Sequence, residues 1–371
     1  MTQNILYVSH TADLRGSAMS LRELMLNLDP LRFKAHALLS KHGPLEDILR
    51  KAEVPCEVVT ERGLLNVRRI LRVRDYIRAN HIDLVHLNSA VPFCRDAGLA
   101  ARLAGVPAVW HIREDPQGKR VRRWSFWIRW LSRRIIVVSS DLEAYFRSSG
   151  KAVKIYNGVD LHRFSPEGGD GGWRERLQIG ADEFVFIVVG TIEERKGQHL
   201  AVEAAARLEG REPFHLIIVG AALGQTDQAL LDTALARHPE IASRVHCVGR
   251  QGDVAPLLRA ADCLMLPSAW EGFPRTVAEG MACGLPVIAT PVGELPWMVK
   301  DGTGWIVPPR DVSSLREAMR LALDSERITH IGAQALKMAK NWSTELHVSR
   351  VESEYDALLK GDRRNSVGKM Q

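Results

Sequence analysis

The chain alternates short apolar runs with longer amphipathic stretches along almost its whole length. Apolar runs of this kind are typical of strands buried on both faces, and the stretches between them have helical periodicity. The runs fall at residues 5–8, 36–39, 84–87, 108–110 and 135–138 in the first half, and at 184–189, 215–219, 245–248, 263–266, 287–289 and 305–307 in the second. This alternation predicts an α/β protein with parallel sheets covered by helices.

A chain of 371 residues is too long for one ordinary core, and each half has the pattern of a doubly wound, Rossmann-like domain. The turn dipeptide Asn157-Gly158 and the glycine-rich segment 165–172 separate the halves. We therefore predict one domain over residues 1–160 and a second over 161–344. A final helix is expected at about 345–360, where apolar residues recur with helical spacing.

Composition indicates a soluble protein, with 46% hydrophobic and 25% charged residues and no run long enough to predict a membrane helix. The N-terminus lacks the features of a leader, and five scattered cysteines favour a reducing compartment. Residues 1–165 carry 27 Lys and Arg against 16 Asp and Glu, whereas residues 166–371 carry 23 against 28. The basic first half suggests an anionic surface or acceptor on that side, although an arginine-rich composition alone also explains it.

Two carboxylates, Glu271 and Glu279, are separated by seven residues and lie just before an apolar strand. Gly272 interrupts regular structure, so Glu271 is expected on a loop. A helix is expected over residues 276–283 and ends at Gly284, which places Glu279 near the start of that helix.

The start of such a helix suits an anionic or hydroxyl-rich ligand, because the first amides of a helix lack partners; those of Phe273 and Arg275 are the candidates. Carboxylates at the same place accept hydrogen bonds from hydroxyls, which points to a sugar or a ribose. An acidic loop followed by an acidic helix cap is the alternative that these residues leave open.

Other loops that follow predicted strands carry groups suited to an anionic ligand. Arg195 and Lys196 lie in a glycine-bounded loop after the strand at 184–189, where they can neutralise a diphosphate leaving group. Gly16 lies in the first strand–helix turn, where glycine lets the backbone approach a phosphate closely. His111 ends a strand. A solvated loop, an ordinary turn and a structural histidine are the corresponding alternatives.

Residues 119–134 have an unusual composition, with seven basic residues, three tryptophans and one phenylalanine. Val121, Trp124, Trp127, Ile128 and Leu131 form the apolar face of a predicted helix. Phe126 and Trp130 fall outside that face, among Arg122, Arg129 and Arg133. Exposed aromatic residues among arginines predict contact with an anionic membrane surface. Packing against a neighbouring loop is the alternative.

These segments resemble, in consecutive order, the motifs of the retaining glycosyltransferases of family 4, also called group 1 glycosyltransferases. The stretch from Glu271 resembles their E-x7-E signature, and the stretch from Asn157 resembles their N-G-V-D-x-x-x-F linker. Loop 190–197 resembles "G-R-x-x-x-x-K-G", the turn at Gly16 resembles "G-G-A-E-x-S-L-x-x-L", and the strand before His111 resembles "V-P-x-V-x-x-H-x".

The resemblance implies a GT-B fold in which two Rossmann-like domains bind acceptor and nucleotide sugar, and in which the final helix packs back on the first domain. It implies that Glu271 lies by the donor sugar, Glu279 by the ribose and Lys196 by the phosphates. It also implies that His111 lies between donor sugar and acceptor. The chain departs from the motifs at Arg15, Ala18, Thr191, Glu294 and Trp297.

From these features we expect a retaining, metal-independent transfer of sugar from a nucleotide-diphosphate donor, without a further cofactor. The expected acceptor is a lipid-linked or cell-envelope glycan of lipopolysaccharide, capsule or exopolysaccharide type. The expected location is cytoplasmic, on the inner face of the cell membrane. A non-catalytic nucleotide-sugar binder and a GT-B phosphorylase or epimerase are the alternatives. No nucleic-acid motif is present.

Overall fold

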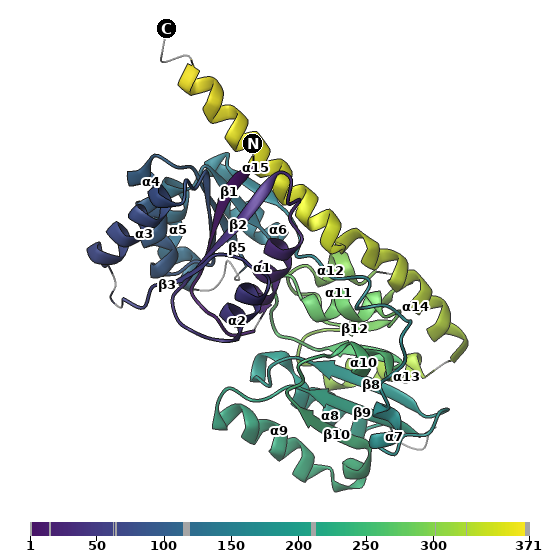
Figure 1. Cartoon of the computed structure of the whole chain (residues 1–371). Coiled ribbons are helices and arrows are strands. Elements are labelled where there is room, and N and C mark those ends of the chain that lie inside the picture. The colour runs from purple at the N-terminus through teal and green to yellow at the C-terminus, as the bar shows by residue number, and fades with distance from the viewer. Residues whose placement is uncertain are drawn as a thin grey trace. The chain divides into compact units, whose positions relative to one another are not determined.

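The computed structural model describes residues 2–14, 16–61, 63, 65–113, 119–208, 213–300, 302–323 and 325–367. The chain divides into two compact units (Figure 1). The first unit comprises Met1–Gly158 and Thr344–Gln371, and the second comprises Val159–Ser343. The sequence placed the change of domain between residues 160 and 161. Each unit contains its own parallel β-sheet, so the predicted α/β class is confirmed.

The first unit has a seven-stranded sheet in the order β3-β2-β1-β4-β5-β6-β7, with every described pair parallel. Its strands are β1 (Gln3–Ser9), β2 (Phe33–Leu39), β3 (Cys56–Val58), β4 (Leu84–Asn88), β5 (Ala108–Ile112), β6 (Arg134–Val137) and β7 (Ala152–Lys154). Its helices are α1 (Gly16–Leu26), α2 (Pro44–Lys51), α3 (Val67–Ala79), α4 (Pro92–Ala104), α5 (Lys119–Leu131), α6 (Ser140–Phe146) and α15 (Thr344–Val367).

The second unit has a six-stranded parallel sheet in the order β10-β9-β8-β11-β12-β13. Its strands are β8 (Phe184–Val189), β9 (Phe214–Val219), β10 (Val245–Gly249), β11 (Cys263–Leu266), β12 (Val287–Ala289) and β13 (Gly304–Ile306). Its helices are α7 (Trp173–Arg176), α8 (Gln198–Ala206), α9 (Gln225–Arg237), α10 (Ala255–Arg259), α11 (Arg275–Ala282), α12 (Leu295–Met298), α13 (Val312–Ala322) and α14 (Ser325–Ala339). Short 3₁₀ turns complete the two units: η1 (Arg147–Ser149) in the first, and η2 (Glu194–Lys196), η3 (Pro239–Arg244) and η4 (Lys340–Trp342) in the second.

Every predicted apolar run falls on a strand, but the sequence did not reveal β3 and β7. These two strands form the edges of the first sheet and have three residues each, all only partly buried. An edge strand faces solvent along one side, and in these two short edge strands the composition is too mixed for an apolar run to mark them. Central strands such as β4 and β5 are buried throughout, which explains why their runs were visible.

The last helix, α15, belongs to the core of the first unit (yellow in Figure 1). Its side chains Val348, Val351 and Tyr355 are buried in the same cluster as Ile5 and Tyr7 of β1. The Tyr355 hydroxyl donates a hydrogen bond to the Tyr7 hydroxyl, at 3.1 Å between the oxygens. The last helix therefore packs on the sheet that contains the first strand.

Candidate active site

In the second unit, residues from two separate motifs form one ion pair. Lys196 Nζ lies 2.5 Å from Glu271 Oε1, and both side chains are largely buried. The same carboxylate oxygen accepts a hydrogen bond from Ser268 Oγ at 2.8 Å. The Ser268 carbonyl accepts one from Thr290 Oγ1 at 2.5 Å. Because these residues follow the ends of β8, β11 and β12, the sheet itself brings them together.

Two glycines fix the loops that carry this ion pair. Gly197, directly after Lys196, has a φ of 73°, and a Cβ there would lie 2.5 Å from the Pro267 carbonyl oxygen. Gly293 has a φ of 55°, and a Cβ there would collide with the Glu271 carbonyl oxygen. Both positions therefore exclude a side chain for conformational and steric reasons. The close approach of these backbones holds Lys196 and Glu271 within reach of each other.

Arg195 is fixed beside the ion pair rather than projecting freely. Its Nε donates to Glu193 Oε2 at 2.6 Å, and its guanidinium lies over the Trp270 ring, 4.3 Å from the ring centre. Its Nη1 is 3.8 Å from Glu271 Oε1. Thr191, which stands where the family motif has arginine, accepts a hydrogen bond from Gln198 Nε2 through its backbone oxygen. Arg195 therefore supplies the second positive charge at this loop.

Glu279 lies in the body of α11 and not at its start. The helix spans Arg275–Ala282, one residue earlier than predicted, and its first turn contains no acidic residue. Glu279 therefore does not cap the helix, which excludes the alternative based on an acidic cap. Its side chain is largely buried, and its Oε1 accepts hydrogen bonds from Arg275 Nε at 3.3 Å and Nη2 at 3.2 Å.

The Phe273 side chain is buried and packs against the Trp342 ring, with 6.1 Å between ring centres. Only its backbone remains as a possible ligand contact. Among the residues that depart from the family motif, Glu294 is buried and Trp297 is 58% exposed.

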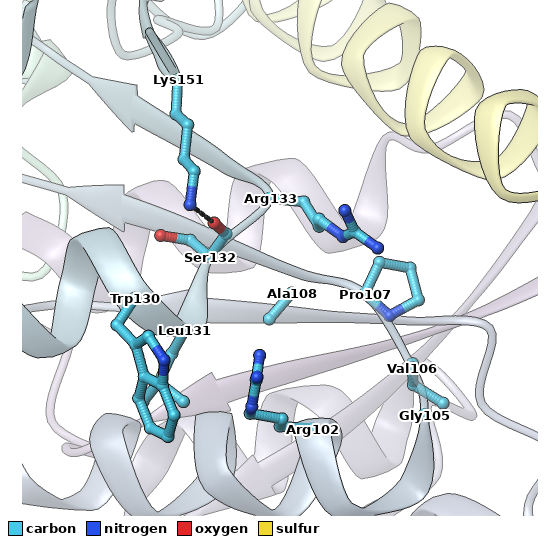
Figure 2. Close-up of a pocket in the computed structure, with 10 residues that line it drawn as sticks. All are labelled: Arg102, Gly105, Val106, Pro107, Ala108, Trp130, Leu131, Ser132, Arg133 and Lys151. Carbon is cyan, nitrogen blue, oxygen red and sulfur yellow. Dashed lines mark hydrogen bonds between the residues drawn. The ribbon is translucent and has the colours of Figure 1, made fainter. Parts of the chain in front are cut away.

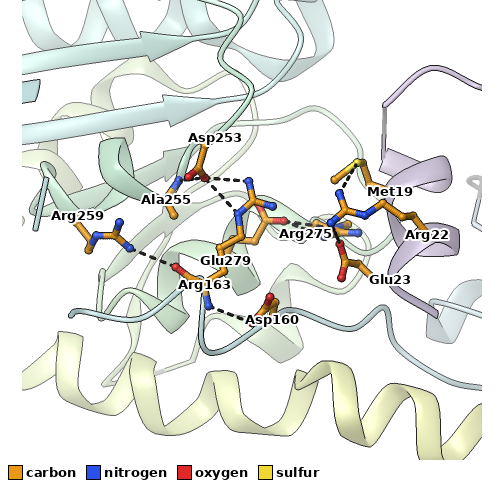
Figure 3. A network of polar contacts seen from close by, with 10 residues as sticks. All are labelled: Met19, Arg22, Glu23, Asp160, Arg163, Asp253, Ala255, Arg259, Arg275 and Glu279. Atoms are coloured by element: carbon orange, nitrogen blue, oxygen red, sulfur yellow. Dashed lines mark hydrogen bonds and ion pairs between the residues drawn. The ribbon is translucent and has the colours of Figure 1, made fainter. Parts of the chain in front are cut away.

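The predicted linker motif is tied to the second unit by an arginine (Figure 3). Asp160 Oδ1 accepts a hydrogen bond from the Arg163 amide at 3.0 Å. The Arg163 side chain pairs with Asp253, in the loop after β10, at 2.9 Å. Arg259 of α10 donates to the Arg163 carbonyl at 3.2 Å. This motif therefore fixes the chain where it enters the second unit.

In the first unit, His111 lies near the end of β5 and is fully buried. Its ring is 5.3 Å from the His86 ring and 6.0 Å from the His347 ring, centre to centre. Arg113 Nη2 lies 3.3 Å from His111 Nδ1. An arginine only donates hydrogen bonds, so Nδ1 is the acceptor and the proton of the neutral ring is on Nε2. Within the described part of the chain, no group hydrogen-bonds this buried Nε2.

Arg113 was not identified from the sequence, yet it joins three segments. Its Nε donates to Asn88 Oδ1 at 2.9 Å, and its Nη1 donates to Asn157 Oδ1. Asn88 ends β4, and Asn157 is the first residue of the linker motif, which the sequence marked as a turn and a linker but not as a partner of Arg113. The two asparagines therefore hold the guanidinium where it contacts His111.

Burial governs the titration of this cluster. Desolvation, reinforced by the Arg113 charge, holds the pKa of His111 and the pKa of His86 well below the usual value for histidine. His86 Nδ1 also lies 2.7 Å from the Tyr355 hydroxyl. Both imidazoles are therefore neutral at physiological pH.

Gly16 is the first residue of α1, and an added Cβ would meet no atom within 4 Å. The backbone is thus open at this point, as close approach of a ligand requires. Arg15, which departs from the family motif, lies outside the described residues, as do Glu114 and Asp115 beyond the end of β5.

Helix α5 has most of the predicted buried face, with Val121, Trp124, Ile128 and Leu131 in the core, whereas Trp127 is only partly buried. Phe126 and Trp130 are 65% and 43% exposed, and their rings stack with 6.4 Å between centres. Arg122 and Arg133 are exposed, but Arg129 is not free to face a membrane. Its Nη1 donates to Ser148 Oγ at 2.6 Å, and its Nη2 to the Tyr145 carbonyl at 2.8 Å. Within the described ranges no helix is long and apolar enough to span a membrane.

Two family models match the chain and together cover most of it. A model of the glycosyl transferases group 1 matches residues 171–344, and a model of glycosyltransferase family 4 matches residues 14–163. The first match contains Lys196, Glu271 and Glu279, and the second contains Gly16 and His111.

Individual relatives are glycosyltransferases. The chain is 33% identical over 226 residues to a D-inositol 3-phosphate glycosyltransferase of Actinosynnema mirum, a match that covers 56% of this chain and 54% of that protein, so the chain spans about half the length of this relative. It is 26% identical over 334 residues to the UDP-Gal:alpha-D-GlcNAc-diphosphoundecaprenol alpha-1,3-galactosyltransferase of Escherichia coli, covering 83% and 84%. The Anabaena protein HepE, solved in complex with UDP, superimposes with a TM-score of 0.84 at 22% identity over 96% of this chain and 100% of that one.

Two parallel-sheet α/β units with this overall likeness define a protein of the GT-B fold. With family models matched in both units, the chain belongs to the group 1 glycosyltransferases.

Proposed function

We propose that this protein transfers a sugar, with retention of configuration, from a nucleotide-diphosphate donor to a lipid-linked or cell-envelope glycan. The observation that carries the proposal is the buried Lys196–Glu271 ion pair, which lies beyond the carboxyl ends of strands in the second sheet. Glu279 follows Glu271 by eight residues. A lysine and an arginine beside one carboxylate, with a second carboxylate further along the chain, match the phosphates and hydroxyls of a nucleotide sugar.

In this proposal Lys196 and Arg195 stabilise the negative charge that develops on the departing diphosphate. Glu271 binds the donor sugar and Glu279 accepts hydrogen bonds from the ribose. The backbone at Gly16, Phe273 and Arg275 contacts the donor, and His111 donates a hydrogen bond from Nε2 toward the transferred sugar. Two basic side chains supply the charge neutralisation for which other transferases use a metal ion, so the proposed reaction needs none.

The proposed chemistry uses no protein nucleophile. The bond from the anomeric carbon to the diphosphate oxygen breaks, and the acceptor oxygen forms its bond on the same face. The departing phosphate oxygen takes the acceptor's proton. Glu271 is given a binding role instead, and its Oε1 accepts hydrogen bonds from Lys196 Nζ and Ser268 Oγ.

The envelope acceptor is proposed from two observations. The E. coli relative is named for a diphosphoundecaprenol-linked acceptor, which is a lipid. Helix α5 carries the exposed Phe126–Trp130 pair with Arg122 and Arg133, a surface suited to anionic lipid. A peripheral position on the cytoplasmic face of the cell membrane follows from that proposal.

Calorimetric titration with UDP, GDP, ADP and dTDP tests the donor site. One diphosphate should bind, and Glu279→Ala should weaken it by about 10- to 150-fold, which corresponds to about 1.5–3 kcal/mol for a lost hydrogen bond to a charged group. Glu240→Ala, which removes an exposed carboxylate of the same unit, is the control and should leave affinity unchanged.

The same preparation distinguishes the alternatives. Binding of none of the diphosphates would refute the proposal. Conversion of a nucleotide sugar without any acceptor would identify an epimerase. Turnover that depends on inorganic phosphate would identify a phosphorylase. Tight binding of a nucleotide sugar without turnover on any glycan acceptor would favour a non-catalytic binder.

A further inference from the structure

The first unit contains a basic cavity of about 460 Å³ that none of the proposed catalytic roles uses (Figure 2). Three segments line it: the end of α4 with the loop before β5, the end of α5 with the loop before β6, and the residue before β7. The lining residues are Arg102, Gly105, Val106, Pro107, Ala108, Trp130, Leu131, Ser132, Arg133 and Lys151.

The cavity lies at the end of the sheet where the strands begin, whereas His111 lies near the end of its strand. Ala108 begins β5, whereas His111 lies near its other end, and strands in this sheet are parallel. A strand rises about 3.3 Å per residue, so the two ends of β5 are separated by roughly 13 Å of sheet. The cavity is therefore a separate site and not an extension of the one that contains His111.

The cavity gathers positive charge. Arg102, Arg133 and Lys151 contribute to its wall, and none of the described residues that line it is acidic. Burial, together with the charges of Arg133 and Arg102, lowers the pKa of Lys151. Like charges brought together in this way repel each other, so an anion bound among them would be stabilised by all three.

The Lys151 ammonium also donates hydrogen bonds to two backbone carbonyls, which leaves one of its N–H groups for a ligand. Its Nζ donates to the Arg129 carbonyl at 2.7 Å and to the Ser132 carbonyl at 2.9 Å, which satisfies backbone oxygens at the end of α5. An ammonium has three N–H groups, so one remains for a ligand. Lys151 therefore fixes the floor of the cavity and adds one donor to it.

An aromatic wall continues from the cavity to the exposed surface of α5. Trp130 lines the cavity, and the Arg102 guanidinium lies over its ring, 4.6 Å from the ring centre. The same tryptophan stacks on the exposed Phe126. Tryptophan and phenylalanine beside basic side chains are suited to the level of lipid headgroups.

We propose that this cavity binds the phosphate of an anionic phospholipid headgroup, while Phe126 and Trp130 enter the boundary between headgroups and acyl chains. The cavity volume exceeds that of a bare phosphate and falls within the range of small-molecule sites, so the polar substituent of the headgroup also fits. The inference rests on the proposed membrane association for its choice of lipid, and it adds a discrete headgroup site to it.

Co-sedimentation with vesicles tests the site. The protein should bind vesicles that contain phosphatidylglycerol and not vesicles of phosphatidylcholine alone. The double variant Arg102→Gln/Arg133→Gln should bind the anionic vesicles about 30-fold more weakly, because each basic residue near an anionic surface contributes roughly fivefold. The matched control is Lys51→Gln/Arg68→Gln, which removes two exposed charges from α2 and α3 of the same unit and should bind nearly as well as the unchanged protein.

Three outcomes would overturn the proposed headgroup site. Equal weakening in both double variants would mean diffuse attraction without a site. Binding of free glycerol 1-phosphate that is lost in the cavity variant, without any vesicle binding, would assign the cavity to a soluble phosphate ester. No binding of either ligand would leave the cavity without this role. Affinity for the nucleoside diphosphate, measured on the same variants, should be unchanged, and a protein that binds vesicles but no diphosphate would refute the proposed transfer and not the headgroup site.

Discussion

Lys196 and Glu271 neutralise each other in the structure, so a diphosphate must compete with the carboxylate for the lysine. Glu271→Gln should release Lys196 while keeping an acceptor for Ser268. We expect the nucleoside diphosphate that the unchanged protein binds to bind at least as tightly to this variant, because the competing charge is gone, whereas sugar transfer should fall. Calorimetry and initial rates measure the two effects separately. Lys196→Ala is the reference, and it should lose roughly 10- to 150-fold in affinity for that diphosphate. A loss of diphosphate binding in Glu271→Gln similar to that of the reference would contradict this reading of the ion pair.

Arg113 is proposed as a positioning residue that sets both the tautomer and the acidity of His111. Burial is the main cause of the lowered pKa of His111, and Arg113→Gln removes the positive charge that lowers it further. The acid limb of kcat/KM should then move to higher pH, and kcat should fall because the ring is no longer oriented. Arg113→Lys keeps the charge but not the paired geometry, so its acid limb should stay in place while kcat still falls. If Arg113 were only structural, both substitutions would lower kcat and kcat/KM and leave the pH profile unshifted.

At the level of elements, α5 presents aromatic residues to solvent on a helix whose other face is core. Replacing Phe126 and Trp130 together with serine should weaken binding to anionic vesicles. The melting temperature should change little, because 65% of the Phe126 surface and 43% of the Trp130 surface are already exposed. Trp124→Ser, on the buried face, is the contrasting variant and should lower the melting temperature by several degrees. A comparable fall in the aromatic double variant would show that the exposed pair stabilises the fold.

Helices and strands with a regular spacing of apolar residues could be predicted from the sequence, but contacts between distant segments could not. The buried face of α5 and the central strands follow from apolar spacing alone. Lys196 and Glu271 were identified separately through family motifs, but they are 75 residues apart and nothing local indicates that they touch. Arg113 had no signal in the sequence, since its partners Asn88 and Asn157 lie 25 and 44 residues away. Asparagine at the end of a buried strand and at the start of the linker is the signal that was available.

At the scale of the whole molecule, the buried histidines make stability depend on pH. His86 and His111 have a lowered pKa in the folded state, whereas in the unfolded chain each takes a proton near pH 6.5. Their contribution is therefore fully present above about pH 6.5 and is lost as the pH falls below it. The expected slope is at most about 1.4 kcal/mol per pH unit for each histidine.

Urea denaturation across this pH range measures that slope. His86→Gln keeps a hydrogen-bonding side chain beside the Tyr355 hydroxyl but cannot be protonated, so its unfolding free energy should depend less steeply on pH. An unchanged slope in this variant would mean that His86 is not neutral in the folded protein, or that other groups dominate acid unfolding.

The joining of α15 to β1 has a consequence for biosynthesis. Tyr7 and Tyr355 are 348 residues apart, and ribosomes add about 5–20 residues per second, so roughly 20–70 s pass between the two. During that interval the nascent sheet around Ile5 and Tyr7 lacks the helix that buries it. The second unit is complete in sequence before this helix emerges, whereas the first unit is not. Although it is translated first, the first unit is thus the last to mature, and its nascent form exposes the kind of apolar surface that chaperones bind.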